Sequence, residues 1–253
     1  MIELAALQSP GIRHGFFTRQ GGVSVGNFAS LNCGYNADAA AHVTENRARA
    51  MRLLQAPAEA LTTVRQVHGT RVIILDEGFD RQGAVQAAAL ATRQKGAVLG
   101  ILTADCAPVL LADPEAGIVG AAHAGWRGAL AGVIEAAVAA MESLGASPAR
   151  IRAGIGPCIT QASYEVGPEF PGRFLGQSPA HGEFFRPAER PEHFQFDLPG
   201  FIASRLRAAG VGEIESIEID TAADADRFFS YRRTCLAGEK AHGLGLSAIG
   251  LGF

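Results

Sequence analysis

Three widely separated motifs in this chain each contain a residue type that binds transition metals. They are RQVHGT around His68, LTADCAPVLL around Cys106 and AAHAGWRG around His123. Intervals of 38 and 17 residues separate the three positions, which is far too wide for a zinc-binding hairpin. A shared site therefore requires a fold that brings three distant turns together. Three protein ligands with an open fourth position are typical of catalytic zinc, whereas structural zinc usually has four protein ligands.

Each of these residues also has a simpler interpretation. His68 could be a hydrogen-bonded histidine at the start of a strand, and Cys106 could be a small buried hydrophobic residue. His123 is the stronger candidate, because it lies between an apolar segment and the glycine-rich turn AGWRG, where a strand should end and a helix begin. The joint occurrence of the three motifs is what favours a metal site.

Composition and charge restrict the class of protein. With 253 residues, 48% of them hydrophobic, the chain can form a sizeable core. No repeat or linker divides it, so we expect one domain over residues 1–253. The formal net charge of −3 gives no overall attraction to nucleic acid or to an anionic membrane. No signal peptide and no membrane-spanning window is evident, so we expect a cytoplasmic protein.

The four cysteines form no CxxC pair and are scattered along a chain that is too long to need disulfides for stability. We therefore expect reduced thiols. Apart from Cys106, we expect all of them to be buried, namely Cys33, Cys158 and Cys235.

The hydrophobic pattern predicts alternating strands and helices. Short apolar runs predict strands at 12–18, 71–75, 97–102, 109–112, 118–122, 151–155 and 214–219. Apolar residues at helical spacing predict helices at 38–56, 129–144 and 198–209. This order favours a mixed sheet flanked by helices. Residues 172–197 are expected to form a long connection, with His181 and His193 facing solvent.

With these motifs, the chain resembles the laccase-domain, or YfiH-type, family, whose members are described both as multicopper polyphenol oxidases and as purine nucleoside phosphorylases. The resemblance covers nearly the whole chain and rests on further motifs in order: TRQGGVS (18–24), ASLN (29–32), ENR (45–47), GIGPCI (154–159), SYEVG (163–167) and FFSYRR (228–233). It implies an α+β fold, a four-layer α/β/β/α sandwich with mixed sheets of the CNF/YfiH-like, cysteine-hydrolase-related type. It also places the metal ligands of the family on His68, Cys106 and His123.

The chain departs from the family pattern at two places. Ala88 stands where family members usually carry an aspartate, and a carboxylate behind a ligand often tunes a metal site. After FFSYRR, the chain reads TCLAGEKAHG instead of the usual DG…TGR stretch. Gly238 and Lys240 retain a glycine and a basic residue, but the usual arginine is missing.

The resemblance implies a zinc-dependent purine nucleoside phosphorylase that uses adenosine, inosine or methylthioadenosine together with phosphate, as a monomer or small homo-oligomer. Arginine holds phosphate through bidentate contacts, the GGVS amides could form an anion-binding nest, and an aromatic ring could stack on the purine. The candidate substrate-binding residues are Arg19, Arg47, Arg65, Gln66 and Tyr164. Phe17 is a further aromatic candidate, although a place in the core is its simpler interpretation.

Adenosine deaminase activity at the same site is a second predicted function. Zinc-activated water attacking C6 of adenosine would release ammonia. The attack needs a group that moves the proton, and Asp105 is the first candidate, with Glu165 the second. Asp105 could instead orient a backbone turn.

Three alternatives use the same residues differently. A site with two histidines and one cysteine can bind copper, but laccase clusters need many histidines in HxH pairs, and this chain has seven histidines and no such pair. Cys106 could be a nucleophile with His123 as its base, a hydrolase chemistry suited to editing peptidoglycan precursors. The chain could also be a metal-dependent binding module without catalysis. Trp126 and Arg127 follow the His123 turn, and a structural role is their simpler interpretation.

Overall fold

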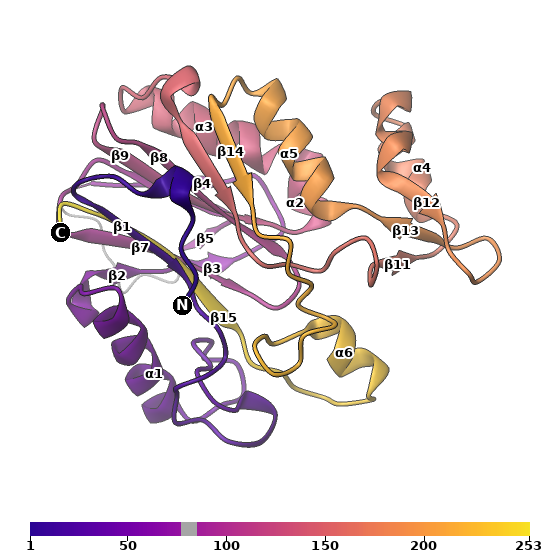
Figure 1. Ribbon diagram of the computed structural model, residues 1–253, viewed down its shortest axis with the longest axis horizontal. Helices are drawn as coiled ribbons and strands as arrows, with labels where there is room; N and C mark the ends of the chain where they lie inside the picture. The colour runs from indigo at the N-terminus through magenta and orange to yellow at the C-terminus, as the bar shows by residue number, and fades with distance from the viewer. Residues whose placement is uncertain (77–84) are drawn as a thin grey trace.

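The computed structural model describes residues 1–76 and 85–253. Two β-sheets are stacked face to face, with helices on both outer faces (Figure 1). Helix α1 (Ala40–Leu53) covers one sheet, and helices α3 (Val133–Ser143) and α5 (Leu198–Ala208) cover the other. This is the four-layer α+β arrangement with mixed sheets that the sequence resemblance implies, and the prediction is confirmed.

The first sheet has the order β1-β15-β7-β2. Its strands are β1 (Ile12–Phe16), β15 (Gly245–Leu251), β7 (Ala97–Thr103) and β2 (Leu61–Thr62). Only the β2–β7 pair is parallel. The second sheet has the order β14-β10-β8-β9-β6-β4, with strands β14 (Glu213–Ser216), β10 (Arg152–Ile155), β8 (Ala107–Asp113), β9 (Ile118–Ala124), β6 (Ala89–Thr92) and β4 (Val72–Leu75). Parallel and antiparallel pairs both occur in it.

Strand β8 shows why the chain forms layers. Successive side chains of a strand point to opposite faces of the sheet. Leu110 and Ala112 therefore pack between the two sheets, whereas Val109 and Leu111 pack under the outer helices. Both faces of this strand are buried, so its sequence is a continuous apolar run instead of an alternating one.

The predicted helix over 129–144 is wrong in one respect, because it is two helices. Helix α2 (Trp126–Ala131) ends at Gly132, where α3 begins, and Gly132 has a φ of 102°. This backbone conformation suits glycine and interrupts the helical hydrogen bonding. As a result α2 begins directly after the His123 turn.

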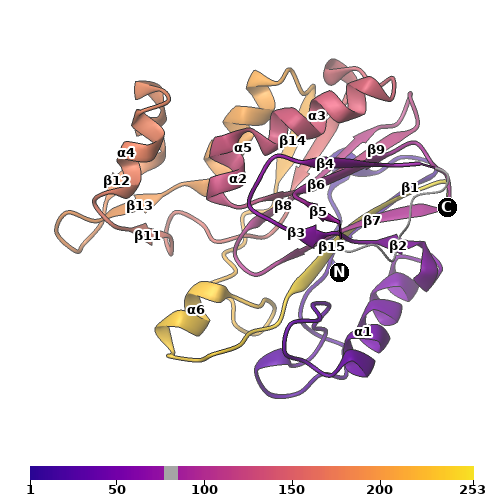
Figure 2. The ribbon, with the colours of Figure 1, turned by 180° about the vertical axis from the view of Figure 1, so that it is seen from behind.

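The predicted long connection over 172–197 is also wrong, because it folds into a small lobe. The lobe contains α4 (Phe170–Leu175), a 3₁₀ helix (Pro179–Phe184) and a sheet of β11 (Glu165–Val166), β13 (Phe194–Phe196) and β12 (Phe185–Pro187). It projects from one end of the sandwich in both views (Figures 1 and 2). His181 does not simply face solvent, because its ring packs 5.1 Å from that of Phe201. His193 is half-buried.

The remaining elements are short. Strands β3 (Arg65–Gln66) and β5 (Gln86–Ala87) form a parallel pair, and helix α6 (Tyr231–Leu236) precedes β15. Further 3₁₀ helices are Ala5–Leu7, Gly26–Phe28, Ala58–Ala60 and Pro148–Arg150. None of the helices in the described part of the chain has the length and apolar character to cross a membrane.

The aromatic core of the lobe yields a stability prediction. Phe174 is fully buried and packs against several other rings, among them Phe196 at 4.7 Å and Phe201 at 5.1 Å between centroids. Phe174→Ala should lower the free energy of unfolding by about 3–5 kcal/mol, because it leaves a large cavity. Urea denaturation measures this, with Phe194→Ala as the control at a half-buried ring of the same lobe. Equal losses in the two variants would contradict a central role for Phe174.

Candidate metal centre

The three side chains predicted from the sequence come together in the structure. His68 follows β3, Cys106 lies in the turn between β7 and β8, and His123 lies near the end of β9. One ligand atom from each lies within 4.8 Å of the other two. Cys106 Sγ is 3.7 Å from His68 Nε2, and the two imidazole centroids are 4.9 Å apart. Within residues 1–76 and 85–253, this is the one group of His, Cys, Asp or Glu side chains with the geometry of a metal site.

The pairing of β8 with β9 places Cys106 next to His123. In the antiparallel register Pro108 lies opposite His123, so the turn that carries Cys106 ends beside it. The amide of His123 donates a hydrogen bond to the carbonyl of Ala88 at 2.8 Å. Ala88 is fully buried, so the core behind His123 holds a methyl group where the family resemblance would place a carboxylate.

The side-chain amide of Gln66 fixes the segment that carries His68. Gln66 Nε2 donates to the carbonyl oxygen of Leu102, and its Oε1 accepts from the amide of the same residue, both at 2.6 Å. These bonds join β3 to the end of β7. Both polar atoms of Gln66 thus bond within the fold, and substrate binding by Gln66 stays a prediction.

The space and the unpaired atoms around His68, Cys106 and His123 are compatible with a bound metal ion. A Cβ atom at Gly125 would lie 2.8 Å from Cys106 Sγ and 2.8 Å from His68 Cδ2, so only glycine leaves the ligands their space. His123 Nδ1 is buried and has no hydrogen-bond partner, which is costly for a polar atom unless something binds it. A cation that accepts nitrogen and sulfur ligands would satisfy this atom.

The three candidate ligands differ in exposure, since His123 is buried, Cys106 is half-buried and His68 is exposed, yet desolvation disfavours the charged form of each. Desolvation, followed by the neighbouring His68, lowers the pKa of His123 to about 4. Desolvation and the charge of Arg127 also lower the pKa of His68. Desolvation, followed by Asp105, raises the pKa of the Cys106 thiol to about 12. Both imidazoles are therefore free to act as ligands at neutral pH, whereas the thiol must lose a proton when a metal binds.

Asp105 connects the Cys106 turn to the C-terminal part of the chain. Its Oδ1 accepts from Thr221 Oγ1 at 2.7 Å, and its Oδ2 accepts from Ser230 Oγ at 2.9 Å and from the amide of Arg232 at 2.6 Å. The residue is buried and adopts a left-handed φ of 82°. This supports the turn-orienting role considered for Asp105 over proton transfer, because both carboxylate oxygens are already engaged.

The three arginines predicted to bind phosphate have different surroundings. Arg19 donates to the carbonyls of Ala29 and Ala225, and Arg47 donates to the carbonyl of Cys33 and to Thr63 Oγ1. Two donor nitrogens of each guanidinium, Nε and Nη1, are thus used within the fold. Arg65 lies exposed on β3. The structure brings none of the three into hydrogen-bond contact with the candidate ligands.

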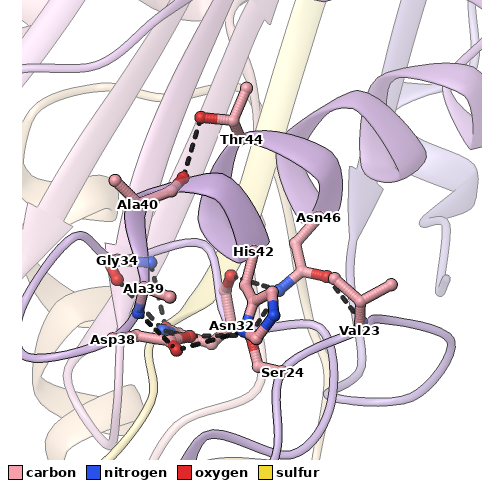
Figure 3. A network of polar contacts seen from close by, with 10 residues as sticks. All are labelled: Val23, Ser24, Asn32, Gly34, Asp38, Ala39, Ala40, His42, Thr44 and Asn46. Atoms are coloured by element: carbon pink, nitrogen blue, oxygen red, sulfur yellow. Dashed lines mark hydrogen bonds and ion pairs between the residues drawn. The ribbon is translucent and has the colours of Figure 1, made fainter.

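The GGVS amides do not form an anion-binding nest, because three of their N–H groups bond within the chain. Gly22 donates to Ser30 Oγ, Ser24 to the Ser30 carbonyl, and Val23 to Asn46 Oδ1. Ser24 Oγ also donates to Asp38 in the network that binds this loop to α1 (Figure 3). These hydrogen bonds fix the shape of the loop and leave those amides unavailable to phosphate.

The other residues considered from the sequence also have definite places. Tyr164 is half-buried between Phe170 and Phe196, while desolvation and then Cys106 raise the pKa of its phenol. Glu165 is half-buried on β11, and Phe17 belongs to the core. Cys33 and Cys158 are buried as predicted, but the prediction for Cys235 is wrong, because it lies exposed on α6. Arg232 was not among the residues predicted to bind substrate, although the arginine pair in FFSYRR could have indicated it.

The space at Gly125 yields a prediction about metal binding. Gly125→Ala should displace Cys106 and His68 and lower the zinc affinity at least about tenfold, because ligand positions in metal sites tolerate only a few tenths of an ångström. Zinc content after dialysis, together with a chelator competition, measures this. Gly172→Ala is the matched control, since nothing lies within 4 Å of its Cβ position. Equal zinc affinity in both variants would contradict the proposed ligand set.

The protonation states yield a pH prediction. The raised thiol pKa means that Cys106 is protonated from pH 7 to 8, whereas the pKa values of both imidazoles are lowered from 6.5, so the neutral forms predominate there. Zinc binding should therefore release about one proton, and the affinity should rise by about tenfold per pH unit. Chelator competition across this range measures the slope, and Cys106→Ala should flatten it. A pH-independent affinity in the unmodified protein would contradict thiolate ligation.

Comparison with known proteins agrees with this geometry. Residues 13–251 match the family model described as multi-copper polyphenol oxidoreductase laccase. A purine nucleoside phosphorylase of Deinococcus radiodurans is 41% identical over 233 residues, which cover 91% of this chain and 88% of that protein. A purine nucleoside phosphorylase of Streptomyces griseus is 40% identical, covering 91% and 93%. The solved structure of YfiH from Bacillus licheniformis superposes with a TM-score of 0.86 at 30% identity and covers 95% of this chain and 92% of that one. The chain therefore belongs to the YfiH-type, laccase-like family.

Proposed function

We propose that this protein is a zinc-dependent purine nucleoside phosphorylase that acts on adenosine, inosine and methylthioadenosine. The observation that carries the proposal is the convergence of His68, Cys106 and His123 within 4.8 Å, in a chain about 40% identical to proteins named purine nucleoside phosphorylases. Phosphorolysis breaks the bond between C1′ of the ribose and the purine nitrogen and forms a bond from C1′ to a phosphate oxygen. The departing base takes up a proton.

Zinc is favoured over copper by the donor set. One thiolate and two imidazoles with an open position suit zinc, which would supply a Lewis acid to the bound substrate. A laccase needs a coupled copper cluster with many histidines. All seven histidines lie in the described part of the chain, and only His68 and His123 belong to a group with metal-binding geometry.

The protonation states favour Cys106 as a ligand instead of a nucleophile. A thiol with a pKa near 12 carries almost no thiolate at neutral pH. His123, with a pKa near 4, is a poor base for it. Tyr164, whose pKa is raised, keeps its phenolic proton and can donate a hydrogen bond to a bound substrate.

Deamination of adenosine at the same site is a second candidate function. It is favoured by the donor set, because two cysteines and one histidine, or a related combination, hold the zinc of nucleobase deaminases. Against it stands Asp105, since a carboxylate with three hydrogen-bond donors is poorly placed to exchange protons. Phosphorolysis remains the first choice.

One experiment separates these functions. Protein of known zinc content is incubated with adenosine, inosine and methylthioadenosine, with and without phosphate. Free base should form only with phosphate, and Cys106→Ala should retain less than about 1% of the rate, because it loses the zinc. Chelation should abolish activity, and added zinc should restore it.

The other outcomes are equally clear. Inosine formed from adenosine without phosphate would support deamination. Full activity after complete removal of zinc would contradict the proposal and point to thiol chemistry. Oxidation of a phenol with copper, in the absence of nucleoside turnover, would support the oxidase reading.

A further inference from the structure

Six arginines stack on aromatic rings in this protein, and their hydrogen bonding divides them into two groups. Arg19 and Arg47 donate to backbone carbonyls, and Arg227 forms an ion pair with Asp224. The other three stacked arginines have no such acceptor within the described residues, and no carboxylate there lies within 4.0 Å of them. They are Arg127, Arg173 and Arg232.

Arg127 lies close in sequence to the candidate metal centre. It is the second residue after Gly125, whose Cβ position touches both Cys106 and His68. Its guanidinium carbon lies 4.6 Å from the centroid of the Trp126 ring. After desolvation, the charge of Arg127 also lowers the pKa of His68.

Arg232 reaches the same region from the C-terminal segment. Its amide donates to Asp105, the neighbour of Cys106, at 2.6 Å. Its guanidinium carbon lies 5.5 Å from the centroid of the Tyr164 ring. The next residue, Arg233, differs completely, because its guanidinium donates to the carbonyls of Thr221, Ala222 and Phe228. Of this arginine pair, only Arg232 keeps its donors available.

The two aromatic supports belong to one cluster. The Trp126 and Tyr164 rings both pack against Phe170, with centroid distances of 4.7 and 6.2 Å. Arg127 and Arg232 are thus held on neighbouring rings beside the three candidate ligands. The positive charges of both lower the pKa of the Tyr164 phenol, although burial raises it overall. The two guanidiniums therefore act on the same side chain.

Stacking prepares a guanidinium to bind an anion. The ring covers the flat face of the group, and the N–H donors around its edge remain free to form bidentate bonds with an oxyanion. Neither guanidinium has an ion-pair partner among the described residues, and together they outnumber the one carboxylate of this region, Asp105, which bonds to the Arg232 amide. An oxyanion would supply the acceptors that both guanidiniums lack.

We propose that Arg127 and Arg232, held on Trp126 and Tyr164, form a phosphate-binding subsite next to the His68, Cys106 and His123 centre. The identification of the anion as the second substrate rests on the proposed phosphorolysis. The same chemistry would also suit the 5′-phosphate of a nucleotide, and the test separates the two sources.

The test measures binding and turnover separately. Calorimetry with inorganic phosphate, and in parallel with adenosine 5′-monophosphate, is performed on the zinc-loaded protein and on Arg127→Gln and Arg232→Gln. Each substitution should weaken phosphate binding about tenfold or more, and lysine at either position should restore only part of it, because lysine keeps the charge but not the fork of donors. In steady-state kinetics, KM for phosphate should rise in the same variants, while KM for inosine should change by less than about threefold.

Arg173→Gln is the matched control. Arg173 stacks on the same Trp126 ring at 5.6 Å, but it comes from α4 in the lobe and does not influence the pKa of His68 or of Tyr164. Its removal should leave phosphate binding unchanged. Zinc content and thermal unfolding of every variant show whether any loss comes from the metal or from the fold.

The outcomes distinguish this inference from the proposed function. Arginine-dependent phosphate binding without base release supports the subsite and contradicts phosphorolysis. Phosphorolysis with an unchanged KM for phosphate in both variants supports the function and overturns the subsite. Arginine dependence for the nucleotide alone supports an oxyanion subsite that serves a nucleotide 5′-phosphate. Unchanged affinity for both anions overturns the subsite.

Discussion

The antiparallel pairing of β8 with β9 is the interaction on which the rest of the structure depends. Every residue of both strands is buried, and both strands lie in the interior of the second sheet. One strand begins directly after Cys106, and the other carries His123, so one set of backbone hydrogen bonds fixes two of the three candidate ligands. Apolar layers on both faces hold these strands, which gives the centre a rigid support.

The same burial determines the electrostatics of the site. Removing polar groups from water disfavours their charged forms, so His123 stays neutral and the Cys106 thiol stays protonated until a cation arrives. His123 Nδ1, buried without a partner, shows the cost of this arrangement. A metal ion bound to this atom would remove that cost. Metal binding should therefore stabilise the buried core around His123.

The C-terminal segment completes the site through Asp105. Its carboxylate accepts bonds from residues more than 100 positions away in the chain, and it thereby brings Arg232 next to the Cys106 turn. The Trp126 and Tyr164 rings, which both pack against Phe170 of the lobe, then hold Arg127 and Arg232. Arg19 and Arg47 instead donate to backbone carbonyls of loops, at Ala29, Ala225 and Cys33. The protein thus separates arginines that stabilise the fold from arginines that remain available to a ligand.

The sequence by itself determined the candidate ligands and most of the elements that carry them. His68, Cys106 and His123 were visible because glycine-rich or apolar motifs surround them, and the layered fold followed from the family resemblance. Helix α1 was visible from the helical spacing of its apolar residues, and five strands of the second sheet were visible as short apolar runs between turns, whereas β6 was not predicted. Only the tertiary structure decided which polar side chains face the site. Gln66, Arg19 and Arg47 bond to backbone atoms of segments that are distant in the sequence, and Arg127 and Arg232 do not. A linear pattern records the type of a side chain, but its free donors depend on which neighbours the fold brings within hydrogen-bond distance.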